Sequence, residues 1–294
     1  MRLRCPDCRR PFEIDDQTWP QAAGVACPGG HSFPVRDGVL ELLDTDLARR
    51  LADFLTPFSA IRENDDKRLT DPAAYPLLPD GPAVQGNHEW RLRRYDLEVI
   101  SQLLAGRSRQ RILDFGAWNG WLSNRLAKQG HHVTAIDYFV DEFDGLRARK
   151  FHDSDWLAVQ MNLEDLDVLD EQYDMLIVNR CVQFYTDPPA FAETVKPKIA
   201  PGGCAVLTGL AFLRDPSHRI AGLTALRRQY QDHGFDFFKP MKGYLDFDDK
   251  ARLQRQGWRL TAHRQLLTAN ARSLLSPTAP RYYYAVWQAG QGRP

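Results

Sequence analysis

The feature that most constrains the fold of this chain is the alternation of short apolar runs with helical stretches from about residue 90 onward. Their β-branched and aromatic content is typical of strands: RILDF, HVTAIDYF, WLAVQMN, YDMLIVN, CAVLTGLAFL, WRLTAHRQLL and YYYAVWQAG. Strands that alternate with helices predict βαβ units and a parallel sheet. No long helix separates the last two runs, so we expect them to form an antiparallel pair at the sheet edge.

Length and charge narrow the class of protein. The chain has 294 residues and is 43% hydrophobic, enough for one large domain and a small one. Lys plus Arg equals Asp plus Glu at 38 each, so there is no general attraction for polyanions or anionic lipid. The N-terminus lacks the apolar region of a signal peptide, and the run that starts at Cys204 is too short to span a bilayer. We expect a cytoplasmic protein with no membrane partner.

Cysteines cluster at the N-terminus. The pair Cys5 and Cys8 is followed by Cys27 and His31, which gives three thiolates and one imidazole. This is the ligand set that tetrahedral zinc prefers, and four ligands leave no open position. Residues 1–44 are therefore predicted as a zinc ribbon with a structural Zn²⁺ ion, the alternative being reduced surface cysteines that fall in pairs by chance.

The stretch from Cys5 to HSFPVRDGVLELL resembles the N-terminal zinc ribbon of the guanine methyltransferases that modify large-subunit ribosomal RNA. It is also similar to the small ribbons that accompany other methyltransferases. The two remaining cysteines, Cys181 and Cys204, adjoin strand candidates, where a thiol acts mainly as a small hydrophobe. We assign them no chemistry.

Two further segments interrupt the pattern. Residues 45–89 are rich in Pro, Asp and Gly and are predicted as a linker or irregular lid, before an amphipathic helix that starts near Trp90 and ends before Gly106. Residues 90–294 form the main domain, with an insertion over 209–257. Its aromatic residues are expected either to cap an acceptor pocket or simply to pack the insertion onto the sheet: Phe235, Phe237, Phe238 and Tyr244.

A glycine turn follows the first strand of this domain and runs from Asp114 to Gly120. It matches neither the dinucleotide pattern G-x-G-x-x-G nor the phosphate loop G-x-x-x-x-G-K-[ST]. An acid at the strand end would repel a phosphate, whereas S-adenosylmethionine presents an ammonium and a sulfonium. The turn therefore favours S-adenosylmethionine as the bound nucleotide.

The turn resembles motif I of the class I S-adenosylmethionine-dependent methyltransferases, D-x-G-x-G-x-G. Asp114, Gly116 and Gly120 are in place, and Trp118 stands where the middle glycine is usual. The resemblance implies a Rossmann-like α/β fold with a seven-stranded sheet and an antiparallel last strand. It also implies that the indole points away from the cofactor or alters its site, and that the whole turn binds the cofactor, Ala117 and Asn119 included.

The same resemblance supplies the other cofactor residues. Asp137 ends the second strand and is placed to accept hydrogen bonds from the ribose hydroxyls, with Tyr138 beside it. Segment MNLEDL matches the region at the adenine edge, with Asn162 and Leu163 as its contacts. Two more candidates lie at the carboxyl edge of the fourth strand, where α/β sheets bind ligands: Asn179 and Arg180.

Methyl transfer is an in-line displacement that needs alignment and, for a neutral acceptor, removal of one proton. Candidate catalytic residues are His88 and Glu89 at a helix start, and Gln183 and Tyr185 after the fourth strand. The first two could instead face water, and the last two could only line the pocket wall.

Three functions fit the sequence. The favoured one is an enzyme that methylates a small organic acceptor. An RNA methyltransferase is the alternative, with phosphate contacts from basic residues of the ribbon and of the following helix: Arg2, Arg4, Arg9, Arg10 and 91–94. The third is a binding module without turnover, in which the ribbon docks a protein.

Overall fold

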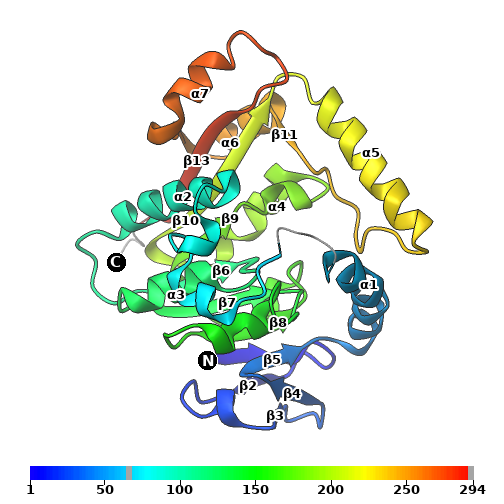
Figure 1. Cartoon of the computed structure of the whole chain (residues 1–294). Helices are drawn as coiled ribbons and strands as arrows, with labels where there is room; N and C mark the ends of the chain where they lie inside the picture. The colour runs from blue at the N-terminus through cyan, green and yellow to red at the C-terminus, as the bar shows by residue number, and fades with distance from the viewer. Residues whose placement is uncertain (64–67, 291–294) are drawn as a thin grey trace.

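The computed structural model describes residues 1–63 and 68–290, and eleven strands of these residues form one sheet (Figure 1). Seven of them have the spatial order β8-β7-β6-β9-β10-β13-β12. All pairs are parallel except those of β13, which is antiparallel to both neighbours. The bounds are β6 Arg111–Phe115, β7 His132–Asp137, β8 Leu157–Met161, β9 Tyr173–Asn179, β10 Ile199–Leu213, β12 Arg259–Ala262 and β13 Arg281–Gln288.

This arrangement confirms the predicted parallel sheet and the antiparallel pair at its edge. Helices cover both faces of the sheet, so alternate residues of the central strands are buried on opposite sides. Ile112 belongs to the core beneath α2 (His88–Leu104) and α3 (Trp121–Lys128). Leu113 belongs to the core that also contains Phe191 of α4 (Pro188–Thr194) and Leu253 of α6 (Phe247–Arg255).

The N-terminal segment continues the same sheet. Strand β5 (Val39–Leu42) pairs in parallel with β8, with Leu40 opposite Val159, and β4 (Ser32–Arg36) and β3 (Gly24–Ala26) follow in antiparallel order. Strands β1 (Arg2–Arg4) and β2 (Pro11–Glu13) form a separate hairpin. The predicted ribbon region is thus joined to the main domain by backbone hydrogen bonds.

The prediction of an irregular segment over 45–89 is wrong at its start, because α1 (Thr45–Glu63) is a regular helix. Asp44 accepts a hydrogen bond from the Leu47 backbone N–H (2.8 Å), and Leu47 and Leu51 are buried. Within the described residues from 68 to 87, the Pro-rich part forms short 3-10 helices, as its composition suggests. The 3-10 helices are Trp19–Gln21, Pro72–Leu77, Pro82–Val84, Leu146–Phe151, Leu166–Val168, Val182–Phe184, Lys196–Lys198 and Arg264–Leu266.

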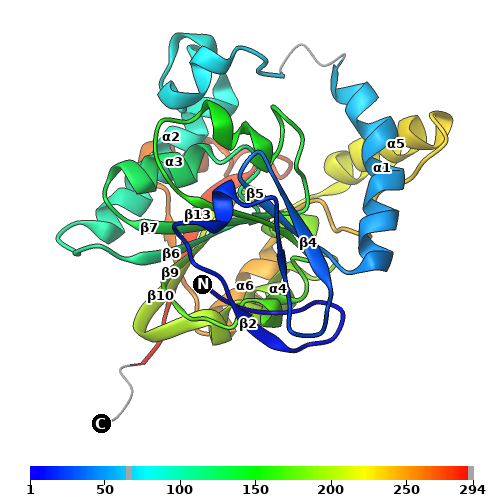
Figure 2. The same cartoon turned by 90° about the horizontal axis from the view of Figure 1, so that it is seen from below.

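Residues 214–244, which we call the cap, follow β10 and contain α5 (Ser217–Asp232). Strand β11 (Leu245–Asp246) and α6 then return the chain to the sheet, and α7 (Leu267–Arg272) precedes β13. Figure 2 shows α1 beside α5, and the two helices touch through Phe58 and Tyr230, whose ring centroids are 6.3 Å apart. In the described residues, no helix combines the length and apolar character needed to cross a membrane.

Candidate functional site

A cleft of about 1150 Å³ opens at the carboxyl ends of β6, β9 and β10. The turn after β6 lines one half of it, which we call the donor half. The end of β10 and the cap line the other, which we call the acceptor half. Ligands of open α/β sheets bind at this edge, so the cleft lies where the sequence places the cofactor.

The turn after β6 depends on backbone conformations that favour glycine. Gly116 has φ +68° and Gly120 has φ +75°. A Cβ on Gly116 would lie 2.7 Å from Cys181 Sγ, and one on Gly120 would lie 2.3 Å from the Trp156 ring. Gly116 and Ala117 line the cleft, whereas Gly120 is required for packing against Trp156.

Trp118 occupies the place of the middle glycine with φ +53°. Its indole stacks on Trp90 of α2, with ring centroids 5.8 Å apart, and also lines the cleft. Its backbone N–H donates to Asp137 Oδ2 at 2.7 Å. Contact with α2 therefore holds the indole beside the turn, while its peptide group orients the neighbouring acid. Asn119 is buried and accepts from the Trp121 N–H, away from the cleft lining.

Asp114 lines the cleft at the tip of β6 and is almost fully buried. Burial raises the pKa of its carboxyl to about 7, against a hydrogen bond of 2.6 Å from the Ser123 hydroxyl, which lowers it. A cationic ligand group beside this carboxyl would favour its ionised form.

The residues predicted for ribose and adenine lie together but are covered. Asp137 accepts from the backbone N–H of Phe139 and of Trp118, and burial raises its pKa. The Tyr138 hydroxyl donates to Asn162 Oδ1 at 2.9 Å, and the ring of Phe238 from the cap packs on Tyr138 at 5.3 Å. None of these predicted ribose and adenine contacts lines the cleft in this structure: Asp137, Tyr138, Asn162 and Leu163.

Asn179 and Arg180 follow β9 and line the cleft. Asn179 Nδ2 donates to Thr208 Oγ1 at 2.7 Å and to Asp96 at 3.4 Å. Arg180 Nη1 also donates to Asp96, a buried acid of α2, at 3.3 Å. Burial raises the pKa of Asp96, and the adjacent guanidinium opposes that rise.

The four candidate catalytic residues separate into two pairs. Glu89 and Gln183 line the cleft, and Gln183 Nε2 donates to the Arg180 carbonyl at 2.7 Å. His88 is exposed outside the lining, and its Nδ1 contacts Arg91 Nη2 at 2.8 Å. Tyr185 is buried with its ring stacked on Phe191 at 3.6 Å, and burial raises its pKa well above the usual range. Of the four candidates, the structure thus leaves Glu89 and Gln183 in the cleft lining.

Arg93 is predicted from the sequence only as part of a basic run expected to contact RNA, whereas the structure places it in the cleft wall. Arg93 lies over the rings of Trp90 and Trp118, at 5.0 and 5.3 Å from their centroids. Burial first and Arg180 second lower its pKa to about 10. The helical spacing of three between Trp90 and Arg93 was a signal for a shared face, although nothing in the sequence joined that face to the turn.

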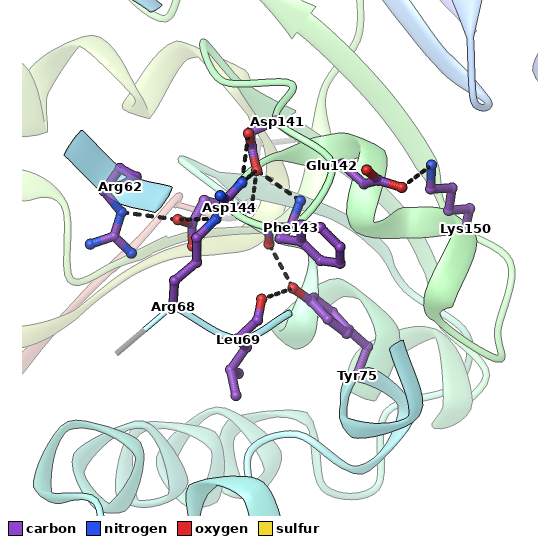
Figure 3. Close-up of polar contacts among 9 residues, drawn as sticks. All are labelled: Arg62, Arg68, Leu69, Tyr75, Asp141, Glu142, Phe143, Asp144 and Lys150. Carbon is purple, nitrogen blue, oxygen red and sulfur yellow. Dashed lines mark hydrogen bonds and ion pairs between the residues drawn. The ribbon is translucent and has the colours of Figure 1, made fainter. Parts of the chain in front are cut away.

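A second missed cluster fastens the loop after β7 to the lid segments (Figure 3). Asp144 accepts from Arg62 of α1 at 2.9 Å, and Asp141 accepts from Arg68 at 2.8 Å. The Tyr75 hydroxyl is within 2.9 Å of the Phe143 carbonyl. Arg62 and Asp144 line the cleft, so this clamp also shapes its rim.

The four predicted metal ligands are brought together. The ligand atoms of Cys5, Cys8, Cys27 and His31 all lie within 4.8 Å of one another. Cys8 Sγ and Cys27 Sγ are 3.7 Å apart, close to the roughly 3.8 Å expected for two thiolates on one tetrahedral zinc ion. A Cβ on Gly29 would lie 2.7 Å from Cys8 Sγ, so the loop has no room for a side chain there. The donor set fits zinc.

Comparison with known proteins gives a family and a fold. The pattern of a family described as a methyltransferase domain matches residues 87–269. Malonyl-[acyl-carrier protein] O-methyltransferase of Erwinia billingiae is 26% identical over 197 residues, which cover 67% of this chain and 73% of that protein. Ubiquinone biosynthesis O-methyltransferase of Aeromonas salmonicida is 28% identical over 109 residues, covering 36% and 46%.

Among solved structures, geranyl diphosphate methyltransferase superposes with a TM-score of 0.50 at 14% identity. The match covers 70% of this chain and 81% of that one. This likeness supports the Rossmann-like α/β fold that the strand order already indicates. No family match covers residues 1–44.

Proposed function

Because the chain belongs to the methyltransferase-domain family and is an S-adenosylmethionine-dependent methyltransferase, we propose that it methylates a small organic acceptor held between the donor turn and the cap. One observation carries this proposal: a single cleft runs from Asp114 at the tip of β6 to the residues of α5. Donor and acceptor would then share one continuous cleft and could be aligned there, as displacement at a methyl carbon requires.

In this proposal the donor turn binds S-adenosylmethionine, whose sulfonium supplies an electrophilic methyl group. Asp114 faces the ammonium, and Asp137, held by two backbone N–H groups, is oriented for the ribose. The cap residue Phe238, which packs on Tyr138, lies where the adenine edge is expected and has to move for the nucleoside to enter. Gln183, which lines the cleft, would orient the acceptor in this proposal.

Three features favour a small acceptor. The lining of the acceptor half includes Phe184, Tyr230 and Tyr244, which suit an apolar or planar body. Two relatives are named as O-methyltransferases acting in malonyl-acyl-carrier and ubiquinone chemistry. The protein's net charge is zero.

Part of the basic patch of the RNA alternative is already paired. Arg4 pairs with Asp170 at 2.9 Å and Arg9 pairs with Asp165 at 2.6 Å, so these side chains fasten the N-terminal segment to the main domain. Arg10 donates to the Pro28 carbonyl. Arginines already paired with acids offer little net charge to phosphates.

We further propose that Cys5, Cys8, Cys27 and His31 hold a structural Zn²⁺ ion. The ligand spacing supports this, and so does the lack of an open position for a reacting group. In this view the ion stabilises β3, β4 and β5, and through them the start of α1.

Incubation of the protein with S-adenosylmethionine labelled in its methyl group, together with a cell extract, tests the function. We expect label in the small-molecule fraction, with no uptake after heat inactivation of the protein. Label in the RNA fraction would contradict the proposal, and so would calorimetry in which neither the donor nor S-adenosylhomocysteine binds.

A further inference from the structure

Two arginines of the cleft wall meet at a single carboxylate oxygen. Arg93 Nη1 and Arg180 Nη2 each lie 3.5 Å from Glu89 Oε2. Direct hydrogen bonds between guanidinium and carboxylate are shorter, at about 2.7–2.9 Å, so both guanidiniums are paired weakly on their cleft side. The Glu89 carboxylate therefore already occupies the point where the two guanidinium groups converge.

The backbone conformation and the neighbouring strand fix the position of Arg180. Arg180 has φ +58°, a conformation that is rare for residues with a side chain and that is often found at functional sites. Its side chain lies against Gly209 within β10, where a Cβ would lie 2.4 Å from Arg180 Cγ. Asp96, which is 2% exposed, holds Nη1 from behind and leaves Nη2 to the cleft.

Glu89, which lies between the two guanidinium groups, is the most exposed member of this cluster. The Glu89 side chain is 60% exposed, whereas those of Arg93 and Arg180 are 18% and 17% exposed. Glu89 lies in the first turn of α2, so its side chain can swing into solvent without disturbing the helix. A ligand carboxylate could replace it and make the shorter, forked contacts that guanidinium groups favour.

We propose that Arg93 and Arg180 bind a carboxylate of the methyl acceptor, and that Glu89 occupies this anion site until the acceptor displaces it. This inference rests on the proposed function and specifies its substrate class: an organic acid. We assign the site to the acceptor because Arg180 lies against Gly209 of β10, and β10 continues into the acceptor half. Arg93 also lies over Trp118 of the donor turn, so the two arginines stand where the donor and acceptor halves meet.

The proposal predicts that two substitutions, each of which removes one charge, change carboxylate affinity in opposite directions. Arg180→Gln removes a charged donor, so we expect carboxylate affinity to fall at least about tenfold. Glu89→Gln removes the competing anion, so we expect affinity to rise about two- to fivefold. Arg180→Lys keeps the charge without the fork and should fall between wild type and Arg180→Gln.

The test is calorimetric titration of the full chain, with and without saturating S-adenosylhomocysteine. Benzoate and malonate are the carboxylate probes, and benzamide and malonamide are their neutral counterparts. Arg91→Gln is the matched control, because Arg91 is an exposed arginine of the same helix outside the cleft lining. Since Arg180→Gln leaves Asp96 with fewer partners, its thermal unfolding is measured alongside, and Glu89→Gln gives a readout that does not depend on that variant's folding.

The expected result is selective binding of the carboxylates, weakened in Arg180→Gln, strengthened in Glu89→Gln and unchanged in Arg91→Gln. Equal binding of acids and amides, or weakening in Glu89→Gln, would overturn the inference. A donor origin of the carboxylate is distinguished with methylthioadenosine, which lacks the amino-acid end. If Arg180→Gln weakens S-adenosylhomocysteine but not methylthioadenosine, the fork belongs to the donor and the inference is wrong. If S-adenosylhomocysteine never binds but the carboxylate pattern holds, the proposed function fails and the anion site stands.

Discussion

The two halves of the cleft satisfy their polar groups in different ways. In the donor half, Asp137 is held by two backbone N–H groups and Asp114 by a buried hydroxyl. In the acceptor half, α5 is exposed along most of its length, and Arg93 and Arg180 share one acid at long range. A rigid half that recognises a constant donor, beside a loosely packed half, is the arrangement expected where only the acceptor differs between related enzymes.

The largest expected effect comes from filling the donor turn with a side chain, which tests whether this half of the cleft binds the donor. Gly116→Val places a branched side chain at φ +68°, with its Cβ 2.7 Å from Cys181 Sγ. Strain and overpacking would distort the turn that is proposed to hold the donor, so we expect S-adenosylhomocysteine affinity, measured by calorimetry on folded protein, to fall by roughly a hundredfold or more. Gly222→Ala in α5 is the control, since nothing lies within 4 Å of its added Cβ, and its donor affinity should match wild type. Retained affinity in Gly116→Val would mean that the turn is not the donor site.

Removing the proposed zinc ion tests whether the N-terminal segment supports both halves. We expect a strong chelator to lower the free energy of unfolding by about 3 kcal/mol or more, shifting the thermal midpoint by roughly 10 °C. The loss arises because β5 pairs with β8 and leads into α1, which carries Phe58 and Arg62 to the cleft. Cys8→Ser should reproduce the shift. Cys204→Ala, a thiol outside the cluster, should keep one zinc per chain by elemental analysis. A midpoint insensitive to chelation would contradict a structural ion.

The pH dependence of donor binding sharpens the comparison at Asp114, whose pKa burial raises to about 7. An ionised Asp114 attracts the donor ammonium, so affinity should rise about tenfold between pH 6 and pH 8. The effect on the stability of the free protein has the opposite sign. The raised pKa means that the native state binds the proton more tightly, so this group destabilises the fold as pH rises from about 4 to about 7. Asp114→Asn should flatten both profiles, and an unchanged binding profile in that variant would assign the titration to another group.

The two halves also differ in how far the sequence predicted them. The strands, α2 and the metal ligands follow from local periodicity and spacing, and Asp114 and Gly116 follow from a motif of adjacent residues. The Arg93–Glu89–Arg180 cluster was not predictable, because it joins a helix to the end of β9 across a large sequence separation. The same applies to Arg4 and Arg9, two residues of the expected RNA patch, whose acids lie about 160 residues away. Helix α1 was missed because Leu47 and Leu51 bury only a narrow stripe and Pro57 interrupts the pattern.

The smallest effect we predict lies at the contact between α1 and the cap. Tyr230 packs on Phe58 at 6.3 Å and on Phe235 at 4.7 Å, and few other side chains of α5 are covered. Tyr230→Ala should therefore loosen the cap and raise the KM of the acceptor about three- to tenfold, because the buried ring and its aromatic contacts are lost. Donor affinity should change less, because the Tyr230 ring packs on Phe58 and on aromatic residues of the cap, whereas the cap meets the donor half through Phe238 on Tyr138. Steady-state kinetics with a methylated acceptor, once identified by labelling, and calorimetry with S-adenosylhomocysteine separate the two. Equal losses in both would mean that the cap closes on donor and acceptor together, and the division of the cleft into a fixed half and an adaptable half would have to be abandoned.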